Sequence, residues 1–455
     1  MSIQKTIFKL YLFLLPFMAL PGVSHLRKAI APNSPISNNL ILLLLGLFLF
    51  ALFQRGRFPF PKKALVIEGV YLCYLLNIIC FITSLVLFIP FGTLNGENTL
   101  RASFPSIIFM FLTAATFYYN AMMFQRITKE EIERIFDWLV LIVLGVGFFQ
   151  LAVLKIPGVA TLYDLINFSG ILVDSSFLQR MGRICFTGSE PSSAGDIVTV
   201  FLLPYIYSKI LTTRALKYKL YAMMFIALLC FTFSSTVYIG VAVGLVTFGY
   251  FYAKHATNQR ILQLLTCCSF AGLILLFCGP YLWQHTSVGN KIEELVFKKT
   301  TSQENLSTLT RYSSIRADWQ AFLHYPLTGV GNGNQGYFYN SAVEQALSAQ
   351  ALQYGELSDR LEGNVGIVNG GAFIPAFISG YGIIGVILLI LFAKQCVGYI
   401  RKHPEEYGSF RYMYYIGGIT FGGLATAATG LDGNFITLFI VSIPFMQPLF
   451  KEKHK

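Results

Sequence analysis

The chain has 455 residues, of which 55% are hydrophobic and 12% are charged, and its mean hydropathy is +0.60. Soluble domains carry about 25% charged residues, so this composition excludes an ordinary water-soluble globular protein. Runs of roughly 18 or more apolar residues recur along the chain, and each is long enough to cross a bilayer as a helix. The sequence therefore predicts an all-α polytopic membrane protein.

The apolar runs predict twelve transmembrane helices. The predicted spans lie near Ile7–Val23, Asn38–Gln54, Ala64–Phe91, Ala102–Phe124, Phe136–Lys155, Ser192–Leu211, Tyr218–Ser234, Ser235–Ala253, Ile261–Tyr281, Ala372–Gln395, Arg411–Gly430 and Gly433–Phe450. Only "FSSTV" separates the seventh span from the eighth, so one broken helix is the alternative there. The first run lacks a small-residue cleavage site after its apolar core, which predicts a retained anchor.

A polar segment interrupts this pattern late in the chain. Leu282–Gly371 is rich in Asn, Gln, Ser and Gly, and roughly 90 residues are too many for a simple connection. The chain is thus predicted to comprise nine helices in 1–281, a folded periplasmic cap in 282–371 and three helices in 372–455.

The loop charges predict the orientation. With the N-terminus in the cytoplasm, most of the 34 lysines and arginines fall on the inner side, as the positive-inside rule requires. Both termini are then cytoplasmic, and the cap and the Lys155–Ser192 loop face the periplasm. The net charge of +12 records this topology and gives no indication of nucleic-acid binding.

The eight cysteines give no sign of a metal or cofactor site. They form no CxxC pair, and all but Cys185 fall in apolar runs, where small packing residues are expected. Zinc, haem and iron–sulfur spacings are missing from the sequence. The sequence predicts neither a metal nor a cofactor.

Inside the predicted cap, the run from Arg311 to Tyr325 is predicted to form a helix that ends before Pro326. At 100° per residue one face is an apolar stripe, composed of Tyr312, Ile315, Trp319, Phe322 and Leu323. Beside it lies a polar ridge at i, i+4 and i+8, composed of Arg316, Gln320 and His324. The following "GVGNGNQG" is predicted to turn the chain and to offer backbone N–H groups to an anion. A plain surface helix with a flexible turn fits the same pattern.

The stretch "RMGRICFTGSEPSSAGDI" (Arg180–Ile197) places charges before and just inside the sixth span. Pro191 suits the first turn of a helix. An interfacial Arg183 and a Glu190 favoured by the helix N-terminus form the purely structural alternative. Asp196, however, lies about one turn into the span, where an acid is costly unless it faces a cavity or a partner. We therefore predict that this span borders a wet, charged cavity open to the periplasm.

Three motifs in these regions carry a resemblance to a known family. They are "R-x4-G-x-E-P" at Arg183–Pro191, "R-x2-W-x4-H-x-P-L-x-G-V-G" at Arg316–Gly331 and "SGYGIIGV" at Ser379–Val386. In their order and spacing the chain resembles the O-antigen polymerase and O-antigen ligase family of bacterial envelope glycosyltransferases. The resemblance covers about Val140 to Leu391 and is only topological elsewhere.

The resemblance implies a GT-C-like, metal-independent glycosyltransferase of the inner membrane whose active site faces the periplasm. Its substrate would be an oligosaccharide carried on undecaprenyl pyrophosphate in the bilayer, and its partner a chain-length regulator. Such a reaction needs cations to hold the pyrophosphate, a role that suits the arginine forks of Arg183, Arg311 and Arg316.

A base is also needed to draw the proton from the acceptor hydroxyl. Glu190, His324 and Asp318 are the candidates, and Glu190 is favoured because it lies closest to the membrane plane. The expected catalytic residues are Glu190, Arg183, Arg316 and His324. The residues expected to contact the pyrophosphate or glycan are Arg311, Arg360, Arg180, Asp196 and Gln320.

One departure from the family distinguishes its branches. Ligases resemble one another in a His-Asn pair about ten residues before the glycine of the span after the outer loop. Counting back from Gly382, that position holds Gly371 and Ala372, and the nearby Asn369 has no His beside it. A polymerase-like spacing is met by Arg360 and Gly371. A polymerase is therefore preferred, with a ligase or related glycan transferase as one alternative and a flippase or other transporter as another.

Overall fold

A computed structural model describes residues 2–17, 38–53, 65–91, 93–94, 97–167, 172–188, 190–255, 306–338, 372–426 and 435–446. Within these ranges nearly all of the secondary structure is helical, as predicted, and η1 is a π-helix. The elements are α1 (Ser2–Phe13), α3 (Asn38–Phe53), α4 (Leu65–Phe91), β1 (Thr93–Leu94), β2 (Glu97–Asn98), α5 (Thr99–Phe124), α6 (Lys129–Lys155), α7 (Val159–Ile166), α8 (Ser175–Met181), η1 (Gly195–Leu202), α9 (Leu203–Thr213), α10 (Leu216–Leu229), η2 (Cys230–Thr232), α11 (Ser235–His255), α15 (Leu306–His324), η4 (Asn334–Phe338), α18 (Phe373–Lys402), α19 (Pro404–Tyr407), α20 (Phe410–Ala425), α21 (Phe435–Ser442) and η7 (Ile443–Phe445).

Six of the described helices are long and apolar enough to cross a membrane. They are Leu65–Leu87, Thr99–Phe124, Lys129–Lys155, Gly195–Thr213, Ser235–Lys254 and Phe373–Lys402. Two shorter apolar helices, Leu42–Leu52 and Phe435–Phe445, fall in the second and twelfth predicted spans. A polytopic membrane protein is thus supported. The ninth predicted span and most of the predicted cap lie outside the described residues, so twelve spans stay a prediction.

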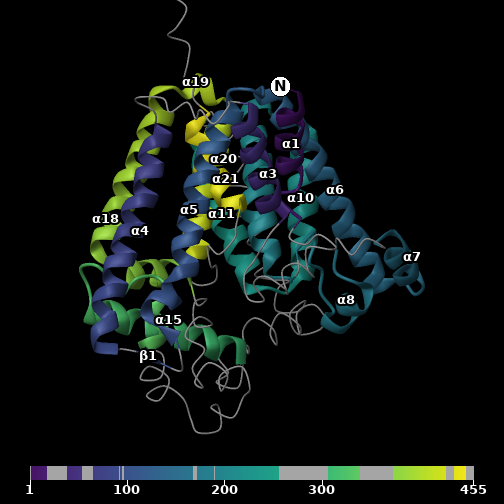
Figure 1. Cartoon of the computed structure of the whole chain (residues 1–455). Coiled ribbons are helices and arrows are strands. Elements are labelled where there is room, and N and C mark those ends of the chain that lie inside the picture. Colours follow the sequence, from purple (N-terminus) through teal and green to yellow (C-terminus); the bar gives the residue numbers. More distant parts are fainter. Residues whose placement is uncertain are drawn as a thin grey trace, which may run out of the picture.

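The helices run side by side between two ends of a bundle (Figure 1). The N-terminus and α19 lie at one end, and α7, α8, α15 and β1 lie toward the other. Along the bundle, α4 packs against α5 and α18, while α9, η1, α11 and α20 pack together at its centre. The described helices of the two segments predicted to face the periplasm, α7, α8 and α15, therefore lie toward the same end, opposite the N-terminus. The seventh and eighth predicted spans are two helices, α10 and α11, separated by η2 and by Phe233 in a left-handed conformation.

Aromatic side chains fill the centre of the bundle. The ring of Phe136 lies 5.0 Å from that of Phe201 and 5.4 Å from that of Phe439, both edge to face. This geometry adds to the free energy of burial because the ring edges are positive and the faces negative. Small residues bring the backbones close: a Cβ at Gly417 would lie 2.9 Å from the carbonyl oxygen of Val200. Small-residue contacts of this kind are typical of membrane helices.

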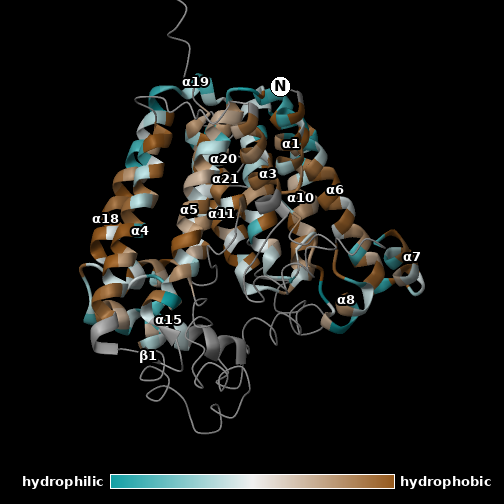
Figure 2. Ribbon diagram, in the orientation of Figure 1, coloured by the Kyte–Doolittle hydropathy of each residue, from teal (hydrophilic) through white to brown (hydrophobic). Residues whose placement is uncertain are grey.

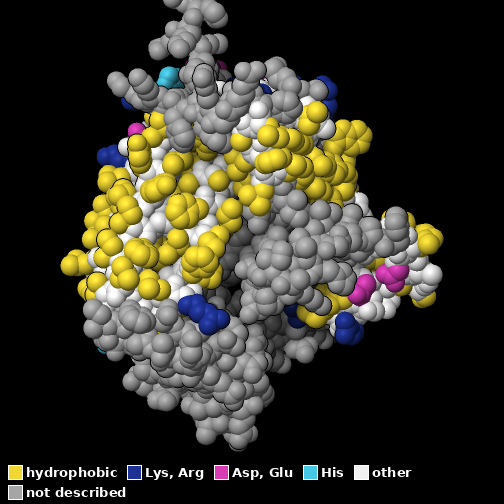
Figure 3. Space-filling view, in the orientation of Figure 1, with side chains coloured by type: hydrophobic (Ala, Val, Ile, Leu, Met, Phe, Trp, Pro, Cys, Tyr) yellow, Lys and Arg dark blue, Asp and Glu magenta, His cyan; other side chains and the backbone are white. Residues whose placement is uncertain are grey.

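The surface matches a membrane environment. Brown, hydrophobic residues run along the sides of the bundle and teal residues gather at the end near α19 (Figure 2). On the described part of the visible side, hydrophobic side chains predominate along the middle of the bundle, whereas charged side chains lie toward the two ends (Figure 3). Large exposed apolar residues include Val246 at 74%, Met223 at 66% and Ile390 at 59%. Such exposure is stable in lipid and costly in water.

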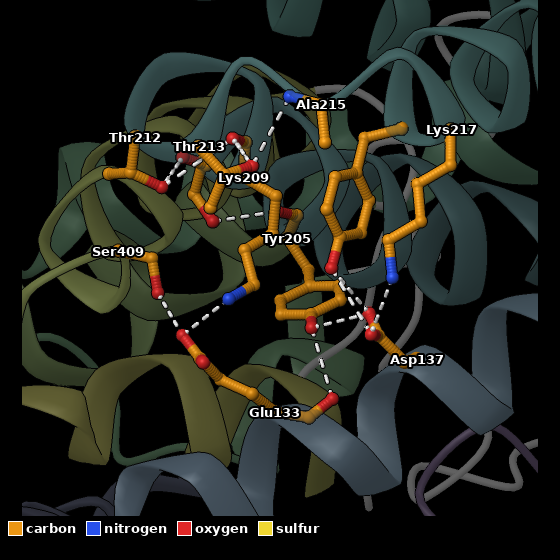
Figure 4. A network of polar contacts seen from close by, with 11 residues as sticks. Glu133, Asp137, Tyr205, Lys209, Thr212, Thr213, Ala215, Lys217 and Ser409 are labelled. Atoms are coloured by element: carbon orange, nitrogen blue, oxygen red, sulfur yellow. Dashed lines mark hydrogen bonds and ion pairs between the residues drawn. The ribbon is translucent and has the colours of Figure 1, made fainter.

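A polar network joins four helices at the N-terminal end of the bundle (Figure 4). Lys209 Nζ lies 2.8 Å from Glu133 Oε1, and the Ser409 hydroxyl donates to the same oxygen. Asp137 accepts from the Tyr205 hydroxyl at 2.8 Å and from Lys217 at 3.2 Å. These bonds tie α6 to α9, α10 and the start of α20.

The two lysines of this network differ in burial, which predicts different effects of their removal. The side chain of Lys209 is 9% exposed and that of Lys217 is 52% exposed. We expect Lys209→Met to cost about 3–5 kcal/mol, because it leaves a poorly hydrated carboxylate without its partner. Lys217→Met should cost about 0–1 kcal/mol. Thermal unfolding of both purified variants in detergent tests this, and equal losses would contradict it.

Candidate functional site

The Arg183–Pro191 loop follows α8 and leads into η1. Gly182 ends α8 in a left-handed conformation, and Ile184 N donates to Phe231 O at 3.2 Å. Phe186 also has a positive φ of 53°, a conformation that disfavours a bulky residue. A tertiary contact must therefore hold this loop in shape.

That contact is Gln150 of α6, which is fully buried. Its Oε1 accepts from the backbone N–H groups of Cys185 at 2.9 Å and Phe186 at 2.8 Å. Its Nε2 donates to Phe186 O at 2.7 Å and to the Tyr163 hydroxyl at 3.2 Å. All four hydrogen-bonding positions of the amide are used. Gln150 belongs to none of the sequence motifs, although an amide inside the fifth predicted span is a signal that it has a polar partner.

Arg183 and Glu190 both lie close enough to Cys185 in this loop to affect the pKa of its thiol. Burial and, to a smaller extent, the Glu190 carboxylate raise the pKa of the Cys185 thiol to about 12, while Arg183 opposes them. Cys185 is therefore an inert thiol between two opposite charges. Arg183 is half-buried, whereas Glu190 is exposed and accepts from the Ser192 hydroxyl at 3.2 Å. Glu190 is thus accessible to a substrate hydroxyl, as a base must be.

Asp196 is the second residue of η1. Its Oδ1 is buried and has no hydrogen-bond partner among the described residues. π-Helical turns are rare and often occur at functional sites, and a buried carboxylate oxygen without a partner is costly. That Asp196 faces a cavity or a partner stays a prediction.

The second group of predicted site residues lies on α15, which ends at His324, before Pro326, as predicted. Arg316 and Gln320 are half-buried and His324 is exposed. His324 Nδ1 lies 2.8 Å from the carbonyl oxygen of Gln320. Because a carbonyl only accepts, Nδ1 carries the proton in this arrangement, and Nε2 of a neutral ring is left free to take one. Nε2 is therefore the ring nitrogen through which a neutral His324 can act as a base.

The predicted apolar stripe is not the buried face of α15. Trp319 is 44% exposed and Leu323 is 72% exposed. The buried residues are small or polar, namely Ser313, Ser314, Ala317, Asp318 and Ala321. Small residues let α15 approach α18 closely, as in other membrane helix pairs, so the apolar stripe faces away from the buried side of the helix.

The prediction that the glycine-rich run offers its backbone N–H groups to an anion is contradicted at most of its positions, because those N–H groups already have partners. Val330 N donates to Ser379 O at 2.8 Å, and Gly331 N donates to Gly380 O at 3.0 Å. In return, Ile383 N donates to Pro326 O at 2.9 Å. The run thus packs against the broken start of α18, so that two of the motifs behind the family resemblance form one structural unit.

Asp318 lies in this unit and not on the polar ridge. It is 5% exposed, and the Ser379 hydroxyl donates to its Oδ1 at 3.1 Å. Burial raises its pKa to about 8, and the bond from Ser379 partly opposes that shift. A carboxyl that stays protonated near neutral pH and is closed off from solvent is a poor general base. Of the three candidates, Glu190 and His324 are the accessible ones.

The pKa of Asp318 predicts a pH dependence of stability. Between about pH 4 and about pH 8 the folded protein keeps a proton that the unfolded chain loses, so its free energy of unfolding falls as the pH rises. Asp318→Asn matches the neutral acid in shape and should remove this pH dependence of the free energy of unfolding. Above pH 8 the variant should therefore gain stability relative to the unsubstituted protein. Unfolding midpoints measured across pH 4–9 test this, and parallel curves for the two proteins would contradict it.

The remaining predicted residues are only partly described. Arg180 is exposed at the end of α8. Arg311 belongs to α15 but its side chain lies outside the described residues, as does all of Arg360. The described hydrogen bonds tie the Arg183–Pro191 loop to α6, and they tie α15 to α18. A shared site of Arg183 and Arg316 therefore stays a proposal.

Comparison with known proteins adds one finding. Residues 220–356 match the family described as O-antigen ligase. The matched part runs from α10 past η4 and includes the Arg316–Gly331 motif, but neither the Arg183–Pro191 loop nor Ser379–Val386. Among curated proteins none matches the chain. The match covers less than half of the chain and does not distinguish ligases from polymerases.

Proposed function

We propose that this chain polymerises oligosaccharide repeat units carried on undecaprenyl pyrophosphate, at the periplasmic face of the bacterial inner membrane. A hydroxyl of the acceptor repeat unit attacks C1 of the donor glycan, and undecaprenyl pyrophosphate leaves. One observation carries the proposal: the matched segment contains α15 with its Arg316–His324 ridge, at the same end of the bundle as α8 and the loop that follows it.

In this reaction the donor already has a good leaving group, so binding and charge stabilisation matter most. Arg183 and Arg316 are proposed to hold the pyrophosphate oxygens, because a guanidinium can donate two parallel hydrogen bonds to them. Glu190 takes the proton of the attacking hydroxyl, with His324 as the second candidate. The proposed contacts to glycan or pyrophosphate are Arg180, Asp196, Arg311, Gln320 and Arg360.

A ligase is the second candidate, because the matched family is described as O-antigen ligase. Polymerase and ligase reactions share the lipid-linked donor and differ in the acceptor. The polymerase is preferred because the ligase-like His-Asn pair is missing before Gly382. A chain-length regulator is a proposed partner of the polymerase.

Glycan analysis of a deletion strain separates the candidates. Loss of a polymerase should leave a single repeat unit where the parent strain carries a full ladder, and the intact chain should restore the ladder. Loss of a ligase should instead leave polymer on the lipid carrier, and loss of a flippase should leave repeat units at the inner face. Arg183→Lys should fail to restore the ladder, because a point charge cannot reproduce the bidentate fork. A full ladder without the chain would refute the proposal.

A further inference from the structure

The short helix α7 has an exposed apolar face. Leu162 is 51% exposed, Leu165 is 71% exposed and Ile166 is 60% exposed. At 100° per residue these three side chains lie within one third of the helix circumference. A face of this kind is unstable in water, so something apolar must cover it.

The position of α7 shows what covers it. α6 is long and apolar enough to span a membrane, and it ends at Lys155. Only three residues separate it from α7, and they reach at most about 10–11 Å. Within this link Ile156 is 54% exposed, and Gly158 turns the chain with a φ of 84°. α7 projects sideways from the bundle (Figure 1), next to the end of the membrane-length helix α6.

The opposite face of α7 is fixed to the protein. Tyr163 is buried, and its hydroxyl donates to Val173 O at 3.0 Å. Asp164 accepts from Ser175 N at 3.0 Å, and Asn167 Nδ2 donates to Leu172 O at 2.9 Å. The helix therefore cannot roll to hide its apolar face.

Tyr163 also connects α7 to the candidate site. Its hydroxyl accepts from Gln150 Nε2, and the same amide group holds the backbone of Cys185 and Phe186. Two buried side chains, Tyr163 and Gln150, thus connect α7 to the Arg183–Pro191 loop through hydrogen bonds.

We propose that α7 lies in the headgroup region of the bilayer with Leu162, Leu165 and Ile166 in contact with lipid, and that Tyr163 and Gln150 thereby hold the Arg183–Pro191 loop at the depth of the lipid headgroups. The lipid contact is independent of the proposed function. The consequence for the loop rests on that function, because a lipid-linked pyrophosphate lies at the same depth.

Depth-dependent quenching tests the lipid contact without using the reaction. The full chain carrying Leu165→Trp is reconstituted in vesicles whose lipids are brominated either near the headgroup or near the chain end. We expect the added fluorescence to be quenched more strongly by the shallow bromines. A matched control is Gln179→Trp, on the exposed surface of α8, which should be quenched much less. Equal quenching at both positions, or a second copy cross-linked through Leu165→Cys, would overturn the proposal.

Transfer kinetics test the connection to the loop. Leu165→Asp should raise the KM for a lipid-linked donor in vesicles several-fold at unchanged kcat, because donor and loop no longer share a depth. Tyr163→Phe removes only the linking hydroxyl and should lower the rate while the quenching of Leu165→Trp in the same background is unchanged. Unchanged kinetics in both variants would overturn the connection. A chain with no transfer activity at all would refute the proposed function and leave the quenching result standing.

Discussion

Replacing Glu190 with glutamine is expected to slow glycan transfer about 10²–10⁴-fold while substrate binding is largely retained. Glutamine keeps the size of the side chain and can still accept from the Ser192 hydroxyl, but it cannot take a proton. If Glu190 served only the helix N-terminus, the change would cost less than about 1–2 kcal/mol of stability and the rate would hardly change. Transfer between purified lipid-linked repeat units, with kcat and KM measured separately, distinguishes the two roles.

His324 provides the matched control for this experiment. It is also exposed, and its Nδ1 is occupied by the carbonyl of Gln320, so Nε2 is the nitrogen available as a base. If Glu190 is the base, His324→Gln should leave a measurable rate. Near-normal transfer by Glu190→Gln together with no transfer by His324→Gln would move the role of base to α15.

Replacing Gly382 with alanine is expected to destabilise the protein by about 2–6 kcal/mol. Its φ of 62° and ψ of −166° suit only glycine. An added Cβ would also lie 2.3 Å from the carbonyl oxygen of Leu327 and 2.6 Å from the amide nitrogen of Gly329. Both obstacles are backbone atoms, so relief requires the Leu327–Gly329 segment to move away from α18, which should also abolish transfer.

Gly398 is the matched control, because it lies in the same helix and a Cβ there meets nothing within 4 Å. Gly398→Ala should leave stability unchanged or slightly raise it, since alanine is the better helix former by about 1 kcal/mol. Unfolding midpoints of the two variants in the same detergent provide the measurement. A Gly382→Ala protein as stable as Gly398→Ala would show that the contact between the Leu327–Gly329 segment and α18 does not constrain this position.

Some features of the site were only partly visible in the sequence. The charged Arg183–Pro191 loop and the end of α15 before Pro326 follow from local rules for charge, capping and proline. Gln150 could be suspected as an amide in an apolar run, but its partners Cys185 and Phe186 lie 35 and 36 residues away. The π-helical turn at Asp196 has no counterpart in the spacing of apolar residues.

By itself the sequence determined the helical membrane class and the positions of most described helices, because the length and polarity of a span are local properties set by the bilayer. Only the tertiary structure decided which face of each helix is buried. In α15 the buried face contains the small residues Ala317 and Ala321, whereas Leu323 is exposed. A large apolar side chain need not be buried in the protein when lipid or another apolar surface can cover it. The tertiary structure likewise decided that the glycine-rich run bonds to the start of α18, since backbone N–H groups that look free in sequence pair with carbonyls roughly 50 residues away.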